Sequence, residues 1–590
     1  MSDFIFSRHV VDPGKLTREI QKIFSEDKPL VDEFHGEWGS LAVSRNHYNG
    51  FLPYENSKHI FIVIGGPILY FRKNDFLDEQ SSNIATKEIY KLWYEKRIRW
   101  DKDLSGPFAV IIIDKETGNI EFITDLMSFI PIYVYQDANS NNILISTHVD
   151  VLAKVSGRNK ELDIISCSDF ILHGVVTFPY TLYKDIFQVQ PASIHHIIKD
   201  SNKIQSEAYW IPEEIYVYNS VKDAAEALLN SLRNYINHIT SNVSNVAQFI
   251  SGGEDSRVLT ALLKKYPRDA YIFLDYMNRE GIIAKKVAEA YHANFKLATR
   301  SKTHYIEILP RSADLIGSGL QYHHAHTFRF HKDCKLIQYG AVFGGLFSDA
   351  LLKGSRIKKK NISKYLLLVP EIKDEHASRI LINNNKFLSP VILEKINIRR
   401  KEHLEYIKSF RKESAHEWVE LWPSSMNFSI ANIHANRRLF KSYEPFLANE
   451  VIKISASIPQ KWKLNRKLFR TATKSLLKRT KWVSHSDGRL PYFPWYVNSI
   501  LQFLFRVNRR IGLKIGYIKG NQGPWGEWKN ILKSHEWRIA VTNYKDSFKL
   551  ISSAFSEKDV TKILNDDSIH HFQRINLLQL LYQIKKMSEN

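Results

Sequence analysis

The sequence has little cysteine, no long apolar run and no basic leader. Its 590 residues include only Cys167 and Cys334, which excludes a disulfide framework and a cysteine-rich metal site. The longest apolar run, residues 59–71, is interrupted by Gly65-Gly66-Pro67 and is too short to span a bilayer. Residues 1–6 lack a basic region followed by an apolar stretch. We therefore expect no secretory signal, no transmembrane segment and a cytoplasmic protein.

Acidic residues are also in short supply. Lysine and arginine number 83 against 62 aspartates and glutamates, a formal net charge of +21. Such a surplus favours anionic partners: a nucleotide, nucleic acid, an acidic substrate or a membrane surface. It is denser at residues 356–360 and 506–519. A solvated basic surface without a partner is the simpler explanation of both stretches.

The length predicts two or three domains. A chain of 590 residues exceeds one core, and its 44% hydrophobic content is typical of globular protein. Short apolar runs cut by Gly, Asn and Asp predict a layered α+β domain in residues 1–210. Alternating helical and strand patterns predict a doubly wound parallel sheet in residues 211–500, followed by a basic helical extension in 501–590. The predicted strands include residues 39–43, 59–65, 107–114, 120–124, 130–135 and 270–277.

The most informative stretch is residues 246–263. An apolar run at 246–250 suits a buried parallel strand, and apolar residues recur at helical spacing over 258–263. Between them lies the turn Ser251-Gly252-Gly253-Glu254-Asp255-Ser256. Adjacent glycines allow close approach of a ligand, and a helix that begins there directs N–H groups and a positive dipole end toward it. This pattern predicts a phosphate-binding turn.

The turn is not a Walker A loop. The Gly-Lys-Ser/Thr ending is missing, and Asp255 stands where a lysine is expected. A carboxylate beside a polyphosphate makes sense if Mg2+ lies between them. In a doubly wound sheet, ligands lie at the carboxyl ends of the strands. The loops after Ile250, Leu274 and Val342 should therefore converge on one nucleotide.

The hexapeptide resembles the S-G-G-x-D-S pyrophosphate loop of the N-type ATP pyrophosphatases. That superfamily, as the resemblance implies, splits ATP into AMP and pyrophosphate to activate a substrate as its adenylate. Backbone groups of Ser251, Gly252, Gly253, Asp255 and Ser256 would then hold the pyrophosphate.

The N-terminal residues resemble the amidotransferase half of glutamine-dependent asparagine synthetases. The matching pieces are residues 104–109 with Asp114, Asp125 with residues 131–133, residues 181–191, and Tyr209-Trp210. The resemblance implies an Ntn-hydrolase-like N-terminal domain ahead of the ATP pyrophosphatase domain. One departure is plain, because the family's nucleophile is an N-terminal cysteine and this chain begins Met1-Ser2-Asp3-Phe4. A serine hydroxyl is a far poorer nucleophile, and the family's R-G-P-D stretch is absent, so we predict no glutamine hydrolysis.

The same resemblance implies further site residues. Residues 336–354 are similar to the family's strand and S-G-x-G-A-D-E-L-F-G-G loop, with Gly344, Gly345, Asp349, Leu351 and Gly354 in register. Asp349 would be the second carboxylate on Mg2+, opposite Asp255, and Leu274 and Gly345 would contact ATP. Ala350 stands where the family has glutamate, which puts the amine-handling half of the reaction in question.

Four residues are candidates for catalysis. Residues 279–288 resemble the family's D-E-x-x-x-A-x-x-V-A run and bring in Glu280, although an exposed glutamate at a helix start explains this residue equally well. The family also has an R-x-K lysine that neutralises pyrophosphate. Here Lys467 lies in a family-like tract, Lys481 comes early for that motif, and Arg489 is nearer the expected place.

Three histidines, His323, His324 and His326, lie between the second and third predicted strands of this sheet and could face the site. As zinc ligands, these histidines lack a further partner at a recognisable spacing. Surface or substrate contacts are therefore the better interpretation.

The resemblance implies an ATP-dependent amide-bond-forming ligase with ATP and Mg2+ as cofactors. The implied reaction resembles that of the β-lactam synthetases and lasso-peptide cyclases, in which the amine belongs to the substrate itself. The substrates would be a small-molecule or peptide carboxylate and an amine. Three alternatives remain: an asparagine synthase that uses free ammonia, a tRNA-modifying ATP pyrophosphatase that binds nucleic acid, and a non-catalytic scaffold.

Overall fold

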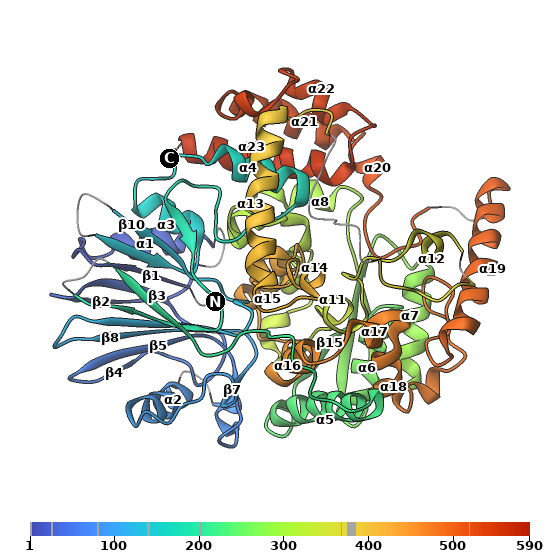
Figure 1. Ribbon diagram of the computed structural model, residues 1–590, viewed down its shortest axis with the longest axis horizontal. Coiled ribbons are helices and arrows are strands. Elements are labelled where there is room, and N and C mark those ends of the chain that lie inside the picture. The colour runs from blue at the N-terminus through green and yellow to red at the C-terminus, as the bar shows by residue number, and fades with distance from the viewer. Residues whose placement is uncertain are drawn as a thin grey trace.

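The computed structural model describes residues 3–24, 28–79, 82–137, 142–199, 203–366, 368–374, 385–517 and 520–589. Met1 and Ser2, on which the predicted loss of glutaminase activity depends, and Lys519 of the basic stretch lie outside these ranges. Figure 1 shows the N-terminal sheets on one side of the molecule, the parallel sheet beside them and most of the C-terminal helices packed above. Within the described ranges, no helix has the length and apolarity needed to cross a bilayer.

The N-terminal part contains two antiparallel sheets of six strands each. In sheet order the first contains β12 (Ile186–Gln188), β10 (Tyr133–Gln136), β11 (Ile143–Ser146), β1 (Phe4–Ser7), β3 (Gly39–Ser44) and β2 (Val31–Gly36). The second contains β14 (Ile204–Ala208), β13 (Ser193–Ile197), β9 (Ile120–Thr124), β8 (Phe108–Asp114), β5 (His59–Gly65) and β4 (Tyr54–Glu55). A short pair is formed by β6 (Ile68–Leu69) and β7 (Leu104–Ser105).

Alternate residues of these strands enter different cores, as the pleat of a strand requires. Phe4 and Phe6 of β1 share one core with Ile62 and other residues of both sheets. Ile5 belongs instead to the larger core, which includes Leu16. The helices of this part are α1 (Lys15–Gln21), α2 (Ile84–Tyr94), α3 (Val149–Val155) and α4 (Ile164–His173). The predicted layered α+β arrangement is thus an antiparallel sheet pair flanked by helices.

Four of the predicted N-terminal strands coincide with β3, β5, β8 and β9 to within a residue. The fifth, predicted at 130–135, begins only at Tyr133. The cause is Asp125, whose carboxylate accepts hydrogen bonds from the backbone N–H groups of Met127, Phe129 and Ile130 at 3.0–3.2 Å. These bonds fold residues 125–130 into a turn.

The second half contains a five-stranded sheet in which every strand pair is parallel. Its order is β17 (Asn294–Thr299), β16 (Arg268–Leu274), β15 (Val246–Phe249), β18 (Ala341–Phe343) and β19 (Ser442–Tyr443). The strand order therefore reverses direction between β15 and β18, the point at which doubly wound sheets bind ligands. The loop after β15 is the predicted phosphate-binding turn.

Both faces of this sheet are covered. Ala270, Ile272 and Leu274 of β16 enter one apolar cluster, while Tyr271 and Phe273 enter another. The strand predicted at 270–277 ends at Leu274, because Asn278 caps the next helix by accepting a hydrogen bond from Gly281 N at 3.2 Å.

The helices of this half are short, apart from α5 and α13. They are α5 (Val221–Thr240), α6 (Glu254–Leu262), α7 (Arg279–Ala290), α8 (His304–Glu307), α9 (Leu309–Ile316), α10 (Phe330–Asp333), α11 (Ser348–Leu352), α12 (Asn361–Tyr365), α13 (Pro390–Lys408), α14 (Ala415–Trp418), α15 (Ile430–Leu439), α16 (Asn449–Ala456), α17 (Gln460–Lys463) and α18 (Lys467–Thr473).

The C-terminal helices are α19 (Trp495–Lys514), α20 (Trp528–Ile531), α21 (His535–Tyr544), α22 (Val560–Asn565) and α23 (His571–Glu589). The boundary predicted at residue 500 falls inside α19. α23 joins distant parts of the chain, because Asn576 Nδ2 donates to Phe170 O of α4 and Gln579 Nε2 donates to Leu320 O. The end of the chain thus packs onto both halves.

Candidate active site

The turn between β15 and α6 is held by its own serines. Ser256 Oγ accepts a hydrogen bond from Ser251 N at 3.0 Å, and the two serine Oγ atoms lie 2.9 Å apart. Gly253 N donates to Ser251 Oγ at 3.1 Å. No side chain caps the amino end of α6, so the first N–H groups of this helix remain for an anion.

Glu280 holds this turn through a hydrogen bond to its backbone. Its Oε1 accepts a hydrogen bond from Gly252 N at 2.7 Å, and only 2% of the residue is exposed. A Cβ at Gly252 would lie 3.1 Å from both Glu280 carboxylate oxygens, which explains the glycine. The alternative interpretation of Glu280 as an exposed helix-start residue is wrong, because α7 brings its first turn under the loop.

Asp255 and Asp349 meet at one ammonium group. Lys353 Nζ contacts Asp255 Oδ1 directly and lies 3.1 Å from Asp349 Oδ1. The lysine is 4% exposed, and α11 places it one turn after Asp349. Burial opposes its protonation, but the charges of Asp255 and Asp349 raise the pKa of Lys353. The lysine is therefore a permanent cation between the two aspartates.

Lys353 occupies the place at which the two aspartates were predicted to hold magnesium. The two carboxylates converge on one point, as ligands of a shared cation do, but the ammonium of Lys353 takes that point. Within the described ranges, no group of three or more histidine, cysteine, aspartate or glutamate side chains could hold a metal ion. As folded, the pair does not fit Mg2+, and binding of the metal here stays a prediction.

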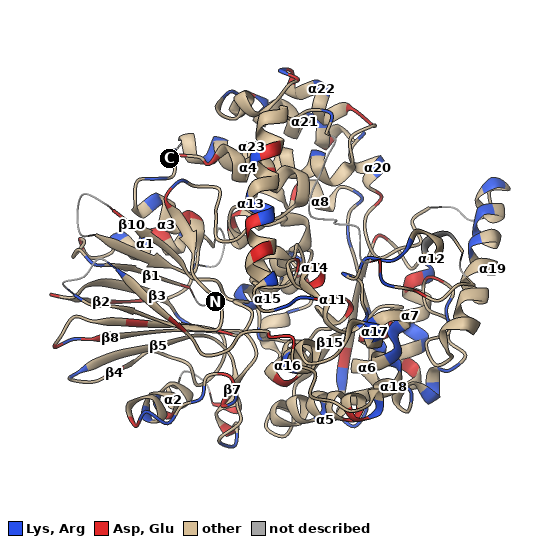
Figure 2. Cartoon of the chain, in the orientation of Figure 1, with Lys and Arg blue, Asp and Glu red and all other residues tan. Residues whose placement is uncertain are grey.

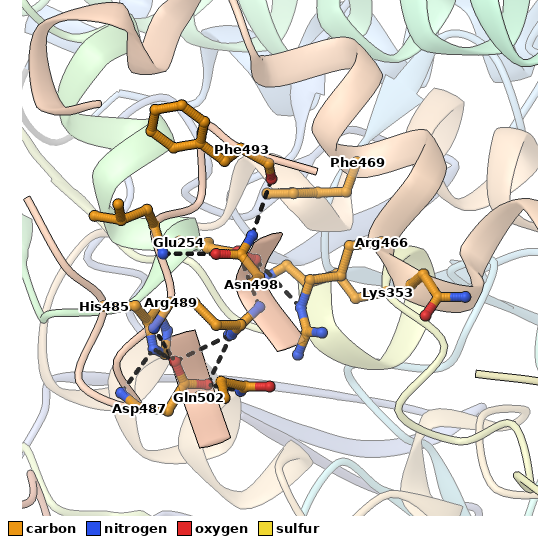
Figure 3. A network of polar contacts seen from close by, with 12 residues as sticks. Glu254, Lys353, Arg466, Phe469, His485, Asp487, Arg489, Phe493, Asn498 and Gln502 are labelled. Atoms are coloured by element: carbon orange, nitrogen blue, oxygen red, sulfur yellow. Dashed lines mark hydrogen bonds and ion pairs between the residues drawn. The ribbon is translucent and has the colours of Figure 1, made fainter. Parts of the chain in front are cut away.

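Glu254, at the variable position of the hexapeptide, is the centre of a second charge cluster (Figure 3). Its carboxylate pairs with Arg489 Nη1 at 3.1 Å and Arg466 Nε at 3.3 Å, and Lys353 Nζ lies 3.9 Å away. Burial opposes its ionisation, but the positive charges of Arg489, Arg466 and Lys353 lower the pKa of Glu254 to about 2. Glu254 and Lys353 therefore join the two clusters into one.

Arg466 reaches Glu254 from a strained backbone. Asn465 and Arg466 both have left-handed conformations, with φ of 53° and 57°. Two successive residues of this kind are costly and persist where the surroundings hold them, often at functional sites. With Arg489, Arg466 lines a cavity of about 80 Å³ beside Glu254.

The other side of the turn opens into a cavity of about 260 Å³. Ser251, Asp255 and Ser256 line it, together with Phe273 of β16 and Gly345 from the loop after β18. Two of the three loops predicted to converge on one ligand, those after Ile250 and Val342, line this cavity, whereas β16 contributes residues of the strand itself and none of the loop after Leu274. A Cβ at Gly345 would lie 3.2 Å from the Asp255 Cβ, so this glycine lets the two loops approach closely.

The ATP contact predicted for Leu274 stays a prediction, and Leu274 does not line this cavity. Its side chain belongs to the core on the α7 side of the sheet, because the strand pleat turns alternate residues to opposite faces. Its neighbour Phe273 lines the cavity instead. At Leu274 only the carbonyl, which accepts from Arg300 N at 3.0 Å, lies near this region.

A C-terminal loop that sequence reasoning missed forms part of the cavity wall. Pro524 and Trp525 line it, and Arg300 Nη2 donates to Pro524 O at 2.8 Å. Asn278 Nδ2 donates to Asn521 O and Gly523 O at 3.0 Å each. Residues 520–526 include three glycines and a proline, which favour a turn, but nothing in this composition indicates the partner of the turn.

The three histidines divide between site and core. His326 lines the cavity, and its ring lies 5.4 Å from that of Trp525. His323 stacks on Phe572 and His324 on Phe428. His323 and His324 are buried and His326 is partly exposed, and desolvation lowers the pKa of each. They are neutral packing groups, with His326 at the cavity wall.

The three basic candidates have different positions. Arg489 lies in the Glu254 cluster and is 6% exposed. Lys467 at the start of α18 and Lys481, whose ammonium lies 5.5 Å from the Trp482 ring, are exposed, and among the described residues neither has an ion pair. Sequence reasoning did not single out Lys353, which stands four residues after Asp349, at the first glycine of the Gly-Gly pair that ends the quoted S-G-x-G-A-D-E-L-F-G-G motif.

The start of the described chain is buried and charged. Asp3 is 0% exposed. Its carboxylate accepts from Arg438 Nε and Nη2 at 2.7 Å and from Arg437 Nη2 at 2.9 Å. Burial opposes ionisation, but the two arginines hold the pKa of Asp3 far below its usual range. The amino end of β1 is therefore tied to α15 of the second half.

Comparison with known proteins agrees with part of this picture. Residues 50–210 match the model of a glutamine amidotransferase domain. A curated relative from Methanocaldococcus jannaschii, named "Putative asparagine synthetase (glutamine-hydrolyzing) 2", is 25% identical over 215 residues, 35% of this chain and 41% of the relative. The chain thus matches about two fifths of that protein's length.

Two solved structures show weak likeness. One is a glutamine phosphoribosylpyrophosphate amidotransferase from B. subtilis complexed with ADP and GMP, with a TM-score of 0.25 and 13% identity over 50% of this chain and 65% of that one. The other, titled as the allosteric regulatory enzyme of purine biosynthesis, has a TM-score of 0.24 and 10% identity over 50% and 80%. Likeness at this level carries no conclusion about activity. The domain match and the curated relative together support a resemblance to the asparagine synthetase-like proteins.

Proposed function

We propose that this chain is an ATP-dependent amide-bond-forming ligase that activates a carboxylate as its adenylate. The observation that carries the proposal is the turn Ser251–Ser256, which begins α6 beside a cavity of about 260 Å³ at the switch point of a parallel sheet. Uncapped N–H groups at a helix start bind phosphate, and the cavity is lined by residues that follow β15, β17 and β18.

In the proposed first step, an oxygen of the substrate carboxylate attacks the α-phosphorus of ATP. A carboxyl oxygen–phosphorus bond forms, and the bond to the bridging oxygen of the β-phosphate breaks. Pyrophosphate leaves with the electron pair. Lys353, Arg466 and Arg489 supply three positive charges beside the turn, where they would stabilise the charge that develops on the leaving group.

In the second step, an amine attacks the activated carbonyl carbon. AMP leaves and the amine loses a proton, which completes the amide. Mg2+ accompanies ATP in solution, but no step is derived through a metal held by Asp255 and Asp349, because Lys353 lies between them. Asp255 and Asp349 instead hold the lysine at the turn.

We also propose that the chain hydrolyses no glutamine. The sequence has serine, not cysteine, at position 2, and the next residue, Asp3, is committed to Arg437 and Arg438. The amine would then be free ammonia or an amine on the substrate itself, as in macrolactam formation on a peptide. The curated relative's name favours testing ammonia and aspartate first.

The test measures pyrophosphate and AMP formed from ATP with a panel of carboxylates, aspartate and short peptides included. Lys353→Met should lower the release by about 100- to 1,000-fold, and Lys467→Met, which changes an exposed lysine outside the cluster, should leave it unchanged. Release of ADP and phosphate in place of AMP and pyrophosphate would disprove adenylation. Glutamate formation from glutamine would disprove the loss of the glutaminase.

A further inference from the structure

One helix of the chain is attached by one face only. α19 runs along the edge of the molecule, and its C-terminal end stands clear of the rest of the chain (Figure 1). On its attached face, Gln502 Nε2 donates to Asp487 Oδ2 at 3.0 Å. The Arg279 guanidinium lies 4.0 Å from the centre of the Phe505 ring. Among its residues only Asn498 and Gly512 are buried.

The opposite face carries an apolar stripe. Its members are Tyr496, Ile500, Phe503, Leu504, Val507 and Ile511. Their spacing of three and four residues places them on one side of the helix. Their exposed fractions run from 38% to 57%, so the side chains touch little of this chain. Contiguous apolar surface of this kind marks a binding face.

The helix that carries the stripe has four cations and no acid. Arg506, Arg509, Arg510 and Lys514 lie on the same helix, and the sequence has no aspartate or glutamate between Gly488 and Gly526. Figure 2 shows blue bands on α19 and no red. Within the described part of the chain, none of these four side chains has a recorded ion pair. The helix therefore combines apolar surface with uncompensated positive charge.

We propose that α19 docks on the surface of an anionic lipid bilayer. The helix would lie flat, with its apolar stripe among the lipid headgroups and upper acyl chains and its arginines on lipid phosphates. Charge decides against a second copy of the helix, because that pairing would bring Arg506, Arg510 and Lys514 of both copies together without an acid on either helix. The same charge complements an anionic membrane.

The experiment measures co-sedimentation of the full chain with two kinds of vesicle. One is phosphatidylcholine mixed with phosphatidylglycerol, and the other is phosphatidylcholine alone. We expect binding to the anionic vesicles that weakens as salt is raised. The double variant Arg506→Gln/Arg510→Gln should bind about 30-fold more weakly, at about 1 kcal/mol for each arginine. The control variant Lys222→Gln/Lys286→Gln removes two exposed cations outside α19 and should bind like the parent protein.

A second pair of variants tests the stripe. Phe503→Ser/Ile511→Ser should lose vesicle binding, whereas Val391→Ser/Leu550→Ser, which changes side chains of similar exposure elsewhere, should keep it. An unchanged thermal midpoint shows that each variant is folded. Equal binding to both vesicle kinds, or full binding by the α19 variants, would overturn the proposal. So would light scattering that shows a dimer which the stripe variants convert to a monomer.

Discussion

Asp3 and Glu254 are both buried carboxylates held by arginines, but they differ in what surrounds their partners. The arginines of Asp3 are themselves sealed, with side chains 3% and 0% exposed. Around Glu254 the cluster reaches the surface, since the Arg466 side chain is 31% exposed and that of Asp349 is 66% exposed. A sealed cluster can only hold elements together. An open one can exchange partners with a ligand.

The first way to test this comparison is to break the sealed cluster. Arg438→Met leaves Asp3 with one arginine in a site that excludes water. Removing one partner of a buried pair costs about 3–5 kcal/mol, so the midpoint of thermal unfolding should fall by several degrees. Arg466→Met, at the open cluster, should change the midpoint far less. Equal losses of stability in the two variants would contradict the distinction.

The second test removes the cation that the open cluster shares. Lys353→Met should lower pyrophosphate release by about 100- to 1,000-fold, the loss typical of one charge-stabilising group. Its fold should persist, because the cluster borders two cavities. Binding of Mn2+ to the variant, followed by electron paramagnetic resonance without ATP, should increase as Asp255 and Asp349 are freed. Unchanged metal binding would show that the aspartates form no cation site even without the lysine.

A third carboxylate, Glu444, sharpens the comparison because, within the described ranges, it forms no ion pair. It is 3% exposed, and Leu346 N donates to its Oε2 at 3.0 Å. Burial raises the pKa of Glu444 from 4.5 to about 8. Its folded pKa lies above its unfolded one, so stability is lost as pH rises from about 4.5 to 8. Glu444→Gln should flatten this part of the dependence of thermal midpoint on pH, compared with the parent protein.

The smallest effect is expected at the exposed lysines. Lys467→Met and Lys481→Met should leave both pyrophosphate release and the thermal midpoint within error of the parent, because exposed side chains without an ion pair contribute little. Arg489→Met, made in parallel, should lose most of the release. Loss of release in either lysine variant would mean that the site extends beyond the Glu254 cluster.

The phosphate-binding turn could be found from sequence because its determinants are local. Strand, diglycine, serines and helix lie within residues 246–263, and each acts on its neighbours. The partners of Glu254 could not be found from the sequence, because Lys353, Arg466 and Arg489 come from segments about 100 to 235 residues away. Lys353 was also hidden because the motif to which the sequence was matched has glycine there.

The same physical reason explains the correct and incorrect details of the fold. Period-two runs predicted most N-terminal strands, but the turn at residues 125–130 depends on one buried aspartate, Asp125, that no periodicity reports. The stripe on α19 was readable as helical spacing, whereas its exposure was not. Exposure depends on what the rest of the chain leaves uncovered.

Asp487 links α19 to the candidate active site, because its carboxylate has one contact in each. Its carboxylate accepts from Gln502 on α19 and from Arg489 beside the phosphate-binding turn. If lipid binding shifts α19, the energy of the Arg489 contact must change with it. Thermodynamic reciprocity then requires that ATP alter the affinity for vesicles by the same factor by which vesicles alter the affinity for ATP. Vesicle titrations with and without the nucleotide would measure that factor, and a factor of one would show that the two surfaces act independently.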